Sequence, residues 1–172
     1  MKQLTLLRHA KSSSADGSLA DHDRPLAKRG QRDAPLMGTR LAARELRPDL
    51  LLTSSATRAL QTAELIEPSL RHSALETRAD PNIYLASPGE LLQVLSRVSD
   101  NIGELVLIGH NPGLTLLANM MLPDLGLDNL PTAGAVTINC DTPSWRDIES
   151  GLFSLSFYDY PKNMDHGTSH RQ

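Results

Sequence analysis

The chain has 172 residues, of which 40% are hydrophobic and 22% are charged, a composition typical of one folded domain rather than of a disordered or fibrous protein. Its net charge of -3 and its aromatic content of 3% argue against a nucleic-acid partner, because such proteins need basic surfaces and stacking side chains. Its only cysteine, Cys140, excludes an internal disulfide and a cysteine-based zinc site and favours a reducing compartment.

The N-terminus gives no sign of export, because its apolar run ends at Arg8 and is too short for the core of a signal peptide. No other apolar run approaches the roughly 20 residues that crossing a bilayer requires. We therefore expect a cytoplasmic protein without a membrane partner. We also expect a monomer.

Short apolar runs that fit buried strands alternate along the chain with segments in which apolar residues recur at helical spacing. The strands are predicted at residues 3–8, 49–53, 75–79, 104–109, 135–140 and 152–157. The helices are predicted at residues 26–46, 57–66, 88–98 and 114–121. This alternation predicts an α/β fold, a three-layer α/β/α sandwich with a mostly parallel central sheet. We expect a single domain over residues 1–160 and a loose C-terminal tail at residues 161–172.

Local signals mark the ends of several predicted helices. Pro35 should kink the first helix or delay its start, because proline removes a backbone hydrogen bond. Ser54 and Ser55 offer hydroxyl groups that could cap the second helix, which Pro68 should follow. Residues 87–90 (Ser-Pro-Gly-Glu) form a capping box that opens the third helix.

In a mostly parallel sheet, ligands bind outside the carboxyl ends of the strands. The residues at or just past those ends include Arg8, His9, Arg58 and His110. A neutral imidazole can attack phosphorus, and an arginine side chain stays charged and matches two phosphate oxygens with parallel hydrogen bonds. Because phosphoryl transfer depends mainly on positioning and charge stabilisation, these residues predict chemistry on a phosphoryl group that requires no metal or other cofactor.

Each of these residues also has a simpler explanation. A single histidine at a strand end is usually structural, and Arg8 could be the solvated end of its strand. Arg58 is harder to explain in this way, because the positive end of a helix dipole disfavours a cation. An anion bound at the same helix end would account for it.

Several ordered segments of the chain resemble the histidine phosphatase superfamily. Residues 6–12 (LLRHAKS) resemble its Arg-His-Gly/Ala motif, in the form found in SixA-type phosphohistidine phosphatases. The other similar segments are residues 23–30 (DRPLAKRG), 54–63 (SSATRALQTA), 106–112 (VLIGHNP) and 130–136 (LPTAGAV). The resemblance spans residues 4 to about 138 and implies the phosphoglycerate mutase-like fold of that superfamily.

The resemblance implies a role for the residues at the predicted strand ends. His9 would be the nucleophile that becomes transiently phosphorylated. Arg8 and Arg58 would bind the phosphoryl oxygens, and His110 would donate a hydrogen bond to the phosphoryl group. The arginines should also lower the pKa of His9 by disfavouring its charged form, so that activity falls only in acid.

Three further residues complete the implied site. Arg24 matches another arginine that this branch brings to the phosphate, although it could also be a solvated loop residue. Ser54 and Asn111 are expected to hydrogen-bond the two histidines and so to support substrate binding.

The proton donor departs from the pattern of the superfamily, many members of which have a carboxylate after the third strand. Asp80 is the nearest candidate for such a general acid, whereas Glu90 is explained by the capping box. Imidazole has a reference pKa of about 6.5 and is an easier leaving group than an alcohol, which needs protonation. A weak or missing acid therefore favours phosphohistidine over phosphate esters as the substrate.

These observations leave three hypotheses. The first is a phosphatase that hydrolyses phosphohistidine on a protein, such as a histidine-containing phosphotransfer domain, and the short connection between residues 82 and 104 would keep its pocket open. The second is a phosphatase of a small phosphomonoester, with Asp80 as general acid. The third is a phosphate-binding module without catalytic activity.

Overall fold

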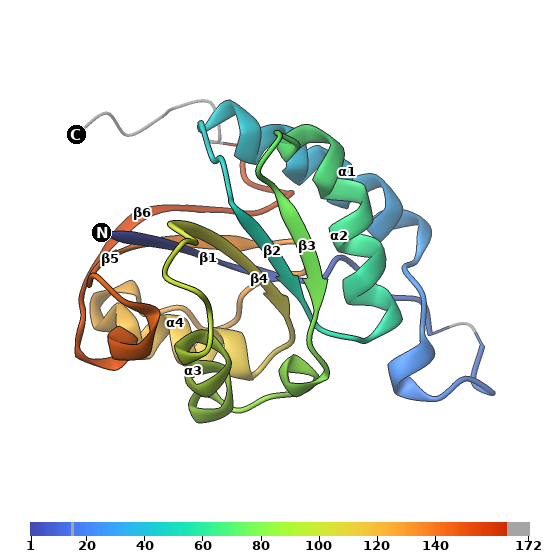
Figure 1. The fold of residues 1–172 in the computed structure, drawn as a ribbon. Coiled ribbons are helices and arrows are strands. Elements are labelled where there is room, and N and C mark those ends of the chain that lie inside the picture. The colour runs from blue at the N-terminus through green and yellow to red at the C-terminus, as the bar shows by residue number, and fades with distance from the viewer. Residues whose placement is uncertain (15, 165–172) are drawn as a thin grey trace.

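The computed structural model describes residues 1–14 and 16–164, and within them six strands form one sheet between two layers of helices (Figure 1). The strands are β1 (Lys2–Arg8), β2 (Leu50–Thr53), β3 (Glu76–Ala79), β4 (Glu104–Gly109), β5 (Ala135–Asp141) and β6 (Leu152–Asp159). The helices of the two layers are α1 (Lys28–Ala43), α2 (Thr57–Leu70), α3 (Pro88–Ser96) and α4 (Gly113–Met121). This architecture confirms the predicted α/β/α sandwich.

The sheet has the strand order β3-β2-β4-β1-β5-β6. Neighbouring strands from β3 to β1 are parallel, whereas β5 is antiparallel to β1 and β6 is antiparallel to β5. All residues of β2 are buried, as expected for a parallel strand that is covered by helices on both faces. The sheet is therefore mostly parallel, and its carboxyl edge collects the loops that follow β1, β2 and β4.

Two apolar cores lie on opposite faces of the sheet. Leu4 and Leu6 of β1 pack into the core that α3 and α4 cover, whereas Leu7 packs into the core under α1 and α2. Figure 1 shows these two helix pairs on opposite sides of the strands. Because successive side chains of a strand point to opposite faces, one apolar strand stabilises both layers.

Three predicted helix ends differ from the structure. Helix α2 continues through Pro68 to Leu70, because Ile66 and Leu70 are buried in the core and offset the hydrogen bond that the proline removes. Helix α1 begins at Lys28 and contains Pro35. The predicted capping box of α3 is present, but the N-cap of α2 is Ala56, without a side-chain cap, because the hydroxyl groups of the preceding serines contact histidines instead.

The register of the sheet determines which side chains meet at its carboxyl edge. Arg8, the last residue of β1, pairs with Gly109, the last residue of β4. The next residues, His9 and His110, therefore leave the sheet side by side. Ser54 follows β2 and lies next to them, since the amide of Ser54 donates a hydrogen bond of 2.9 Å to the carbonyl of Ile108.

Of the tail predicted at residues 161–172, residues 165–172 lie outside the described residues. The single domain over residues 1–160 stays a prediction. None of the helices within the described ranges has the length and apolar character of a membrane span.

Candidate active site

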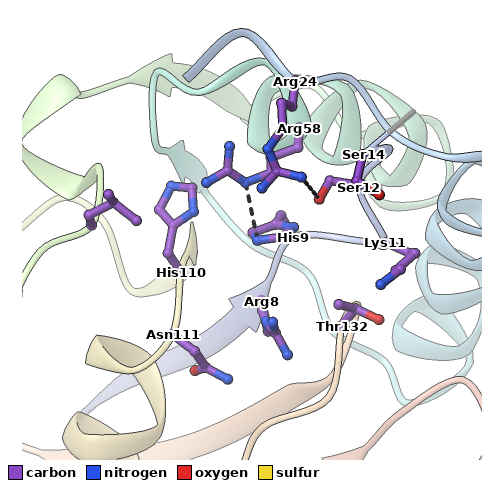
Figure 2. A pocket seen from close by; sticks show the side chains of 11 residues that line it. Arg8, His9, Lys11, Ser12, Ser14, Arg24, Arg58, His110, Asn111 and Thr132 are labelled. Carbon is purple, nitrogen blue, oxygen red and sulfur yellow. Dashed lines mark hydrogen bonds between the residues drawn. The ribbon is translucent and has the colours of Figure 1, made fainter. Parts of the chain in front are cut away.

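A hollow of about 340 Å³ lies at the carboxyl ends of β1 and β4 (Figure 2). The predicted site residues that line it are Arg8, His9, Arg24, Arg58, His110 and Asn111. Two predicted residues, Ser54 and Asp80, are not part of its lining. The imidazole rings of His9 and His110 face the same hollow, with their centroids 5.2 Å apart.

The hydrogen bonds of His9 determine which ring nitrogen can react. Its Nδ1 lies 2.7 Å from the main-chain carbonyl oxygen of Ala10. A carbonyl oxygen can only accept, so Nδ1 carries the hydrogen and the neutral ring has its lone pair on Nε2. The Nε–H of Arg58 donates to that nitrogen at 3.4 Å, as the dashed line in Figure 2 shows. His9 therefore presents an unprotonated Nε2 to the hollow.

Ala10, whose carbonyl orients His9, is held in place by helix α2 through its amide. The amide of Ala10 donates to Oγ1 of Thr62 at 3.0 Å, and that hydroxyl donates to the carbonyl of Arg58 at 2.7 Å. One side chain thus links the residue that orients the nucleophile to the arginine beside it. Thr62 belongs to a segment that resembles the superfamily, but its role was not evident from the sequence. Both of its partners are main-chain groups, and Ala10 is also distant along the chain.

His110 is held through its other ring nitrogen. Its Nε2 lies 2.7 Å from Oγ of Ser54, which also accepts a hydrogen bond of 3.2 Å from the amide of Ala56. A hydroxyl group has one hydrogen to donate, and among the described residues Nε2 of His110 is the only acceptor bonded to Oγ of Ser54, so we assign the hydroxyl hydrogen to that bond. Nδ1 of His110 then carries the ring hydrogen, and it is buried without a partner among the described residues. His110 is therefore equipped to donate to a bound oxyanion.

Two arginines of the hollow share a carboxylate that was not predicted. Asp21 lies in the short 3-10 helix Asp21–Asp23, in the loop after β1. Its Oδ1 accepts hydrogen bonds of 3.1 and 3.0 Å from Arg24, and its Oδ2 lies 3.0 Å from Nη2 of Arg58. The bridging carboxylate offsets the repulsion between two like charges. It therefore permits both guanidinium groups to lie beside His9.

A tyrosine completes this arrangement. The hydroxyl of Tyr84 donates a hydrogen bond to Oδ2 of Asp21, and its ring packs edge-on against His110, with centroids 5.4 Å apart. The hydrogen bond from Tyr84 and those from Arg58 and Arg24 lower the pKa of Asp21 far below its usual range. Asp21 is thus a carboxylate at neutral pH. No sequence signal identified it, since the loop at residues 10–25 has no periodic pattern.

Both histidines are neutral at physiological pH. Burial lowers the pKa of His9 to about 4, with further lowering by Arg58, Arg8 and Arg24, although the hydrogen bond to Ala10 opposes the shift. Burial and the proximity of His9 and Arg58 lower the pKa of His110 to about 3. The arginines therefore act in the predicted direction, but burial contributes most.

Asn111 lines the hollow but does not hydrogen-bond either histidine, contrary to our expectation. Its amide nitrogen donates to the carbonyl of Leu130 at 2.9 Å and to Asn129, and its oxygen accepts from Thr115. The same Leu130 carbonyl accepts a hydrogen bond of 3.0 Å from Nη1 of Arg8. Asn111 thus fixes the loop that positions Arg8.

Asp80 lies outside the lining of the hollow. Its Oδ1 accepts a hydrogen bond of 2.9 Å from the amide of Asn82 and caps the 3-10 helix Pro81–Ile83. Its role as general acid stays a prediction. Glu90 forms the capping box of α3 with Ser87, as expected. Among the described residues, no group of three or more His, Cys, Asp or Glu side chains is arranged to hold a metal ion.

Comparisons with known proteins show which family this chain is similar to in sequence and in fold. The sequence model of the histidine phosphatase superfamily (branch 1) matches residues 4–84. An uncharacterized protein of Mycobacterium tuberculosis is 36% identical over 167 residues, which cover 91% of this chain and 100% of that protein.

Solved structures of SixA proteins have a similar fold. The SixA protein of Agrobacterium tumefaciens has a TM-score of 0.78 at 25% identity, over 93% of this chain and 98% of that chain. The protein histidine phosphatase SixA in complex with tungstate has a TM-score of 0.77 at 20% identity, over 92% of this chain and 97% of that chain. The chain therefore belongs to the histidine phosphatase superfamily and has the fold of its SixA-type members.

Proposed function

We propose that this protein is a phosphatase that transfers a phosphoryl group to Nε2 of His9 and then to water, and that its substrate is phosphohistidine on a protein. Membership of the superfamily and the SixA-like neighbours support the phosphatase activity. The observation that carries the mechanism is the state of His9. Its Nε2 is unprotonated, accepts from Arg58 and faces a hollow that other cations line.

The reaction proceeds in two displacements on phosphorus. In the first, the Nε2 lone pair of His9 forms a nitrogen–phosphorus bond while the bond to the leaving group breaks. In the second, water attacks the phosphohistidine, phosphate is released and the neutral imidazole is regenerated. Nδ1 keeps its hydrogen bond to Ala10 throughout, so the ring is oriented in both steps.

The charge of the phosphoryl oxygens is balanced by side chains on three segments. Arg8 ends β1, Arg24 lies in the following loop and Arg58 lies in the first turn of α2. His110 adds its Nδ1 hydrogen from the end of β4. Such preorganised donors stabilise the transition state because they need no rearrangement as charge develops. The tetrahedral tungstate ion bound by the related SixA structure is the kind of oxyanion that this set would accept.

No suitable acid lines the hollow among the described residues, which favours phosphohistidine as the substrate. Asp80 caps a 3-10 helix, and Asp21 has a strongly lowered pKa and holds no proton at neutral pH. An alkoxide leaving group would need a proton from such an acid, whereas phosphohistidine protonated on its other ring nitrogen releases neutral imidazole, which is a much weaker base.

The test is to trap the phosphorylated enzyme. The protein is mixed with a histidine-phosphorylated phosphotransfer domain and quenched in alkali, in which phosphohistidine is stable, and the separated enzyme is analysed by intact mass and phosphorus NMR. We expect one added phosphoryl group in the wild type and none in His9→Ala. His72→Ala is the matched control, because His72 bonds the Pro48 carbonyl and does not line the hollow. A phosphorylated His9→Ala variant would mean that another residue is the nucleophile.

A further inference from the structure

A second hollow of about 370 Å³ adjoins the candidate active site. The two hollows share Arg8, Lys11 and Thr132 in their linings. In Figure 2, Lys11 and Thr132 lie on the opposite side of His9 from His110. A substrate with its phosphoryl group at His9 can therefore reach the second hollow by passing over the three shared residues. The proposed mechanism makes no use of this second hollow.

The lining of the second hollow is strongly basic. Besides Arg8 and Lys11 it includes Arg29 and Lys162, and the only carboxylate among the described residues that line it is Asp33. Asp33 is already paired, since its carboxylate oxygens lie 3.8 Å from Arg29 and 3.4 Å from Arg32. Lys11 and Lys162 form no ion pair with any described residue. The hollow thus has an excess of positive charge in a chain whose net charge is -3.

Two of the three arginines that line the active site differ from these lysines, because they are paired with a carboxylate. Arg24 and Arg58 are bridged by the carboxylate of Asp21. No such carboxylate lies within ion-pair distance of Lys11 or Lys162 among the described residues. The charge on that side is therefore available for an anion that comes from outside the chain.

Several contacts hold the basic hollow in shape. Arg29 reaches from α1 to Oγ1 of Thr132, at 3.4 Å. The main chain of Lys11 is fixed against α1, because its carbonyl accepts from the amide of Ala27 at 2.9 Å and a Cβ at Gly30 would lie only 2.2 Å from that carbonyl oxygen. On the remaining side, the carbonyl of Tyr160 accepts from Arg40 at 2.9 Å, close to Lys162. Pro131, Tyr160 and Pro161 add an apolar wall.

We propose that this hollow is a subsite that binds a second anionic group of the substrate, a carboxylate or a phosphate, beside the phosphoryl group that is transferred. The inference rests on the proposed function, because it places the transferred group at His9. On a phosphohistidine protein, the second anion would be an acidic side chain near the phosphorylated histidine. On a small phosphate ester, it would be another acidic group of the same molecule.

Matched ligand pairs test this proposal through binding, separately from turnover. Dissociation constants are measured by calorimetry with His9→Ala, which lacks the proposed nucleophile. One pair is phenyl phosphate and 4-carboxyphenyl phosphate, and the other is two phosphohistidine peptides with glutamate or glutamine at the flanking positions. We expect the acidic member of at least one pair to bind about 5-fold more tightly, and the ratio to fall with added salt.

Variants connect this ratio to the hollow. Lys162→Gln, at an exposed position, should reduce the ratio to about 2-fold, and Lys162→Gln combined with Arg29→Gln should abolish it. Lys28→Gln, at an exposed residue next to Arg29 that does not line the hollow, should leave the ratio unchanged. A preference limited to the peptides identifies an acidic protein as the source, and one limited to the aryl phosphates identifies a small ester.

Equal affinities within both pairs, or a preference that survives the double variant, would overturn the subsite. Turnover by the wild type is measured with the same four compounds. If none of them is hydrolysed while the affinity ratio is present, the proposed function fails and the anion subsite stands. If the compounds are hydrolysed but the affinities within each pair are equal, the proposed function stands and the anion subsite fails.

Discussion

The segments that follow β1 and β4 each begin with a histidine, in matching register, but the two rings are held through opposite nitrogens. His9 donates from Nδ1 to a main-chain carbonyl, whereas His110 is bonded at Nε2 by the Ser54 hydroxyl. A neutral imidazole has one N–H and one lone pair. His9 therefore offers a lone pair to the hollow, and His110 offers a hydrogen. Equivalent positions in the sheet thus acquire different roles from their hydrogen-bond partners alone.

Removal of the lone pair should have the largest effect on activity. We expect His9→Ala to lower kcat on the order of 10⁴-fold or more, because the proposed covalent intermediate forms on Nε2 of His9. The measurement is steady-state release of phosphate, with circular dichroism to verify folding. Activity within about 10-fold of the wild type would show that the two histidines do not differ as proposed.

Removal of the cation beside that lone pair should be the next largest effect. Arg58→Gln deletes the charge that lies next to Nε2 of His9 and should lower kcat by about 10²- to 10³-fold. Rapid-quench kinetics should show that formation of the phosphoenzyme is slowed. Arg71→Gln is a control, because Arg71 is exposed and pairs with Glu67 on the surface. Equal effects of the two substitutions would contradict the proposed contact.

Removal of His110, the proposed hydrogen donor, should lower activity less, and the phosphoenzyme should still form. His110→Ala is expected to lower kcat by about 10²-fold, because a donor to the phosphoryl group is lost while the nucleophile remains. The phosphoenzyme should still be detected by intact mass after an alkaline quench. Complete loss of the phosphoenzyme would show that His110 is as necessary as His9 for its formation, which contradicts the proposed difference between nucleophile and hydrogen donor.

The hydroxyl that orients His110 should matter less again. Ser54→Ala leaves Nε2 without its partner and should lower kcat by about 10-fold, as for other groups that orient an active-site histidine. The neighbouring substitution Ser55→Ala is the matched control, since Ser55 contacts His22 and lies outside the lining of the hollow. An unchanged kcat in Ser54→Ala would indicate that His110 needs no such partner.

Acid should protonate the two rings at different pH values. Because both transitions lie far below neutral pH, the effect of pH on activity near neutrality should be the smallest of those predicted. His9 loses its lone pair only when pH falls toward about 4, and His110 is protonated near 3, so NMR titration should show no imidazole transition for either ring at 6.5. The unfolded chain protonates both rings near 6.5. Burial of the neutral rings therefore costs no proton binding above pH 6.5. Below it the unfolded chain binds protons that the folded chain does not, so denaturant unfolding should show the free energy of unfolding falling as pH decreases from 6.5 toward 4. A His9 transition near 6.5 would contradict its burial.

The alternation of apolar runs with helical spacing determined the fold class and the residues that end β1 and β4, because those patterns are local along the chain. It also placed the arginine of α2 at the site. The extension of α2 through Pro68 was missed, since the burial of Leu70 depends on packing against other elements.

The tertiary structure alone decided how these residues are bonded. The family resemblance led us to expect a hydrogen bond from Ser54 to a histidine, but only the fold shows that the partner is His110, 56 positions along the chain. The bridge from Asp21 to Arg58 joins residues 37 positions apart and was not expected. Asp80, the candidate general acid, caps the 3-10 helix Pro81–Ile83, a contact that the sequence analysis did not anticipate, and its role as an acid stays a prediction. The sequence by itself thus determined which chemical groups reach the carboxyl edge of the sheet. Which nitrogen of each imidazole carries the hydrogen depends on partners that only folding brings within hydrogen-bonding distance.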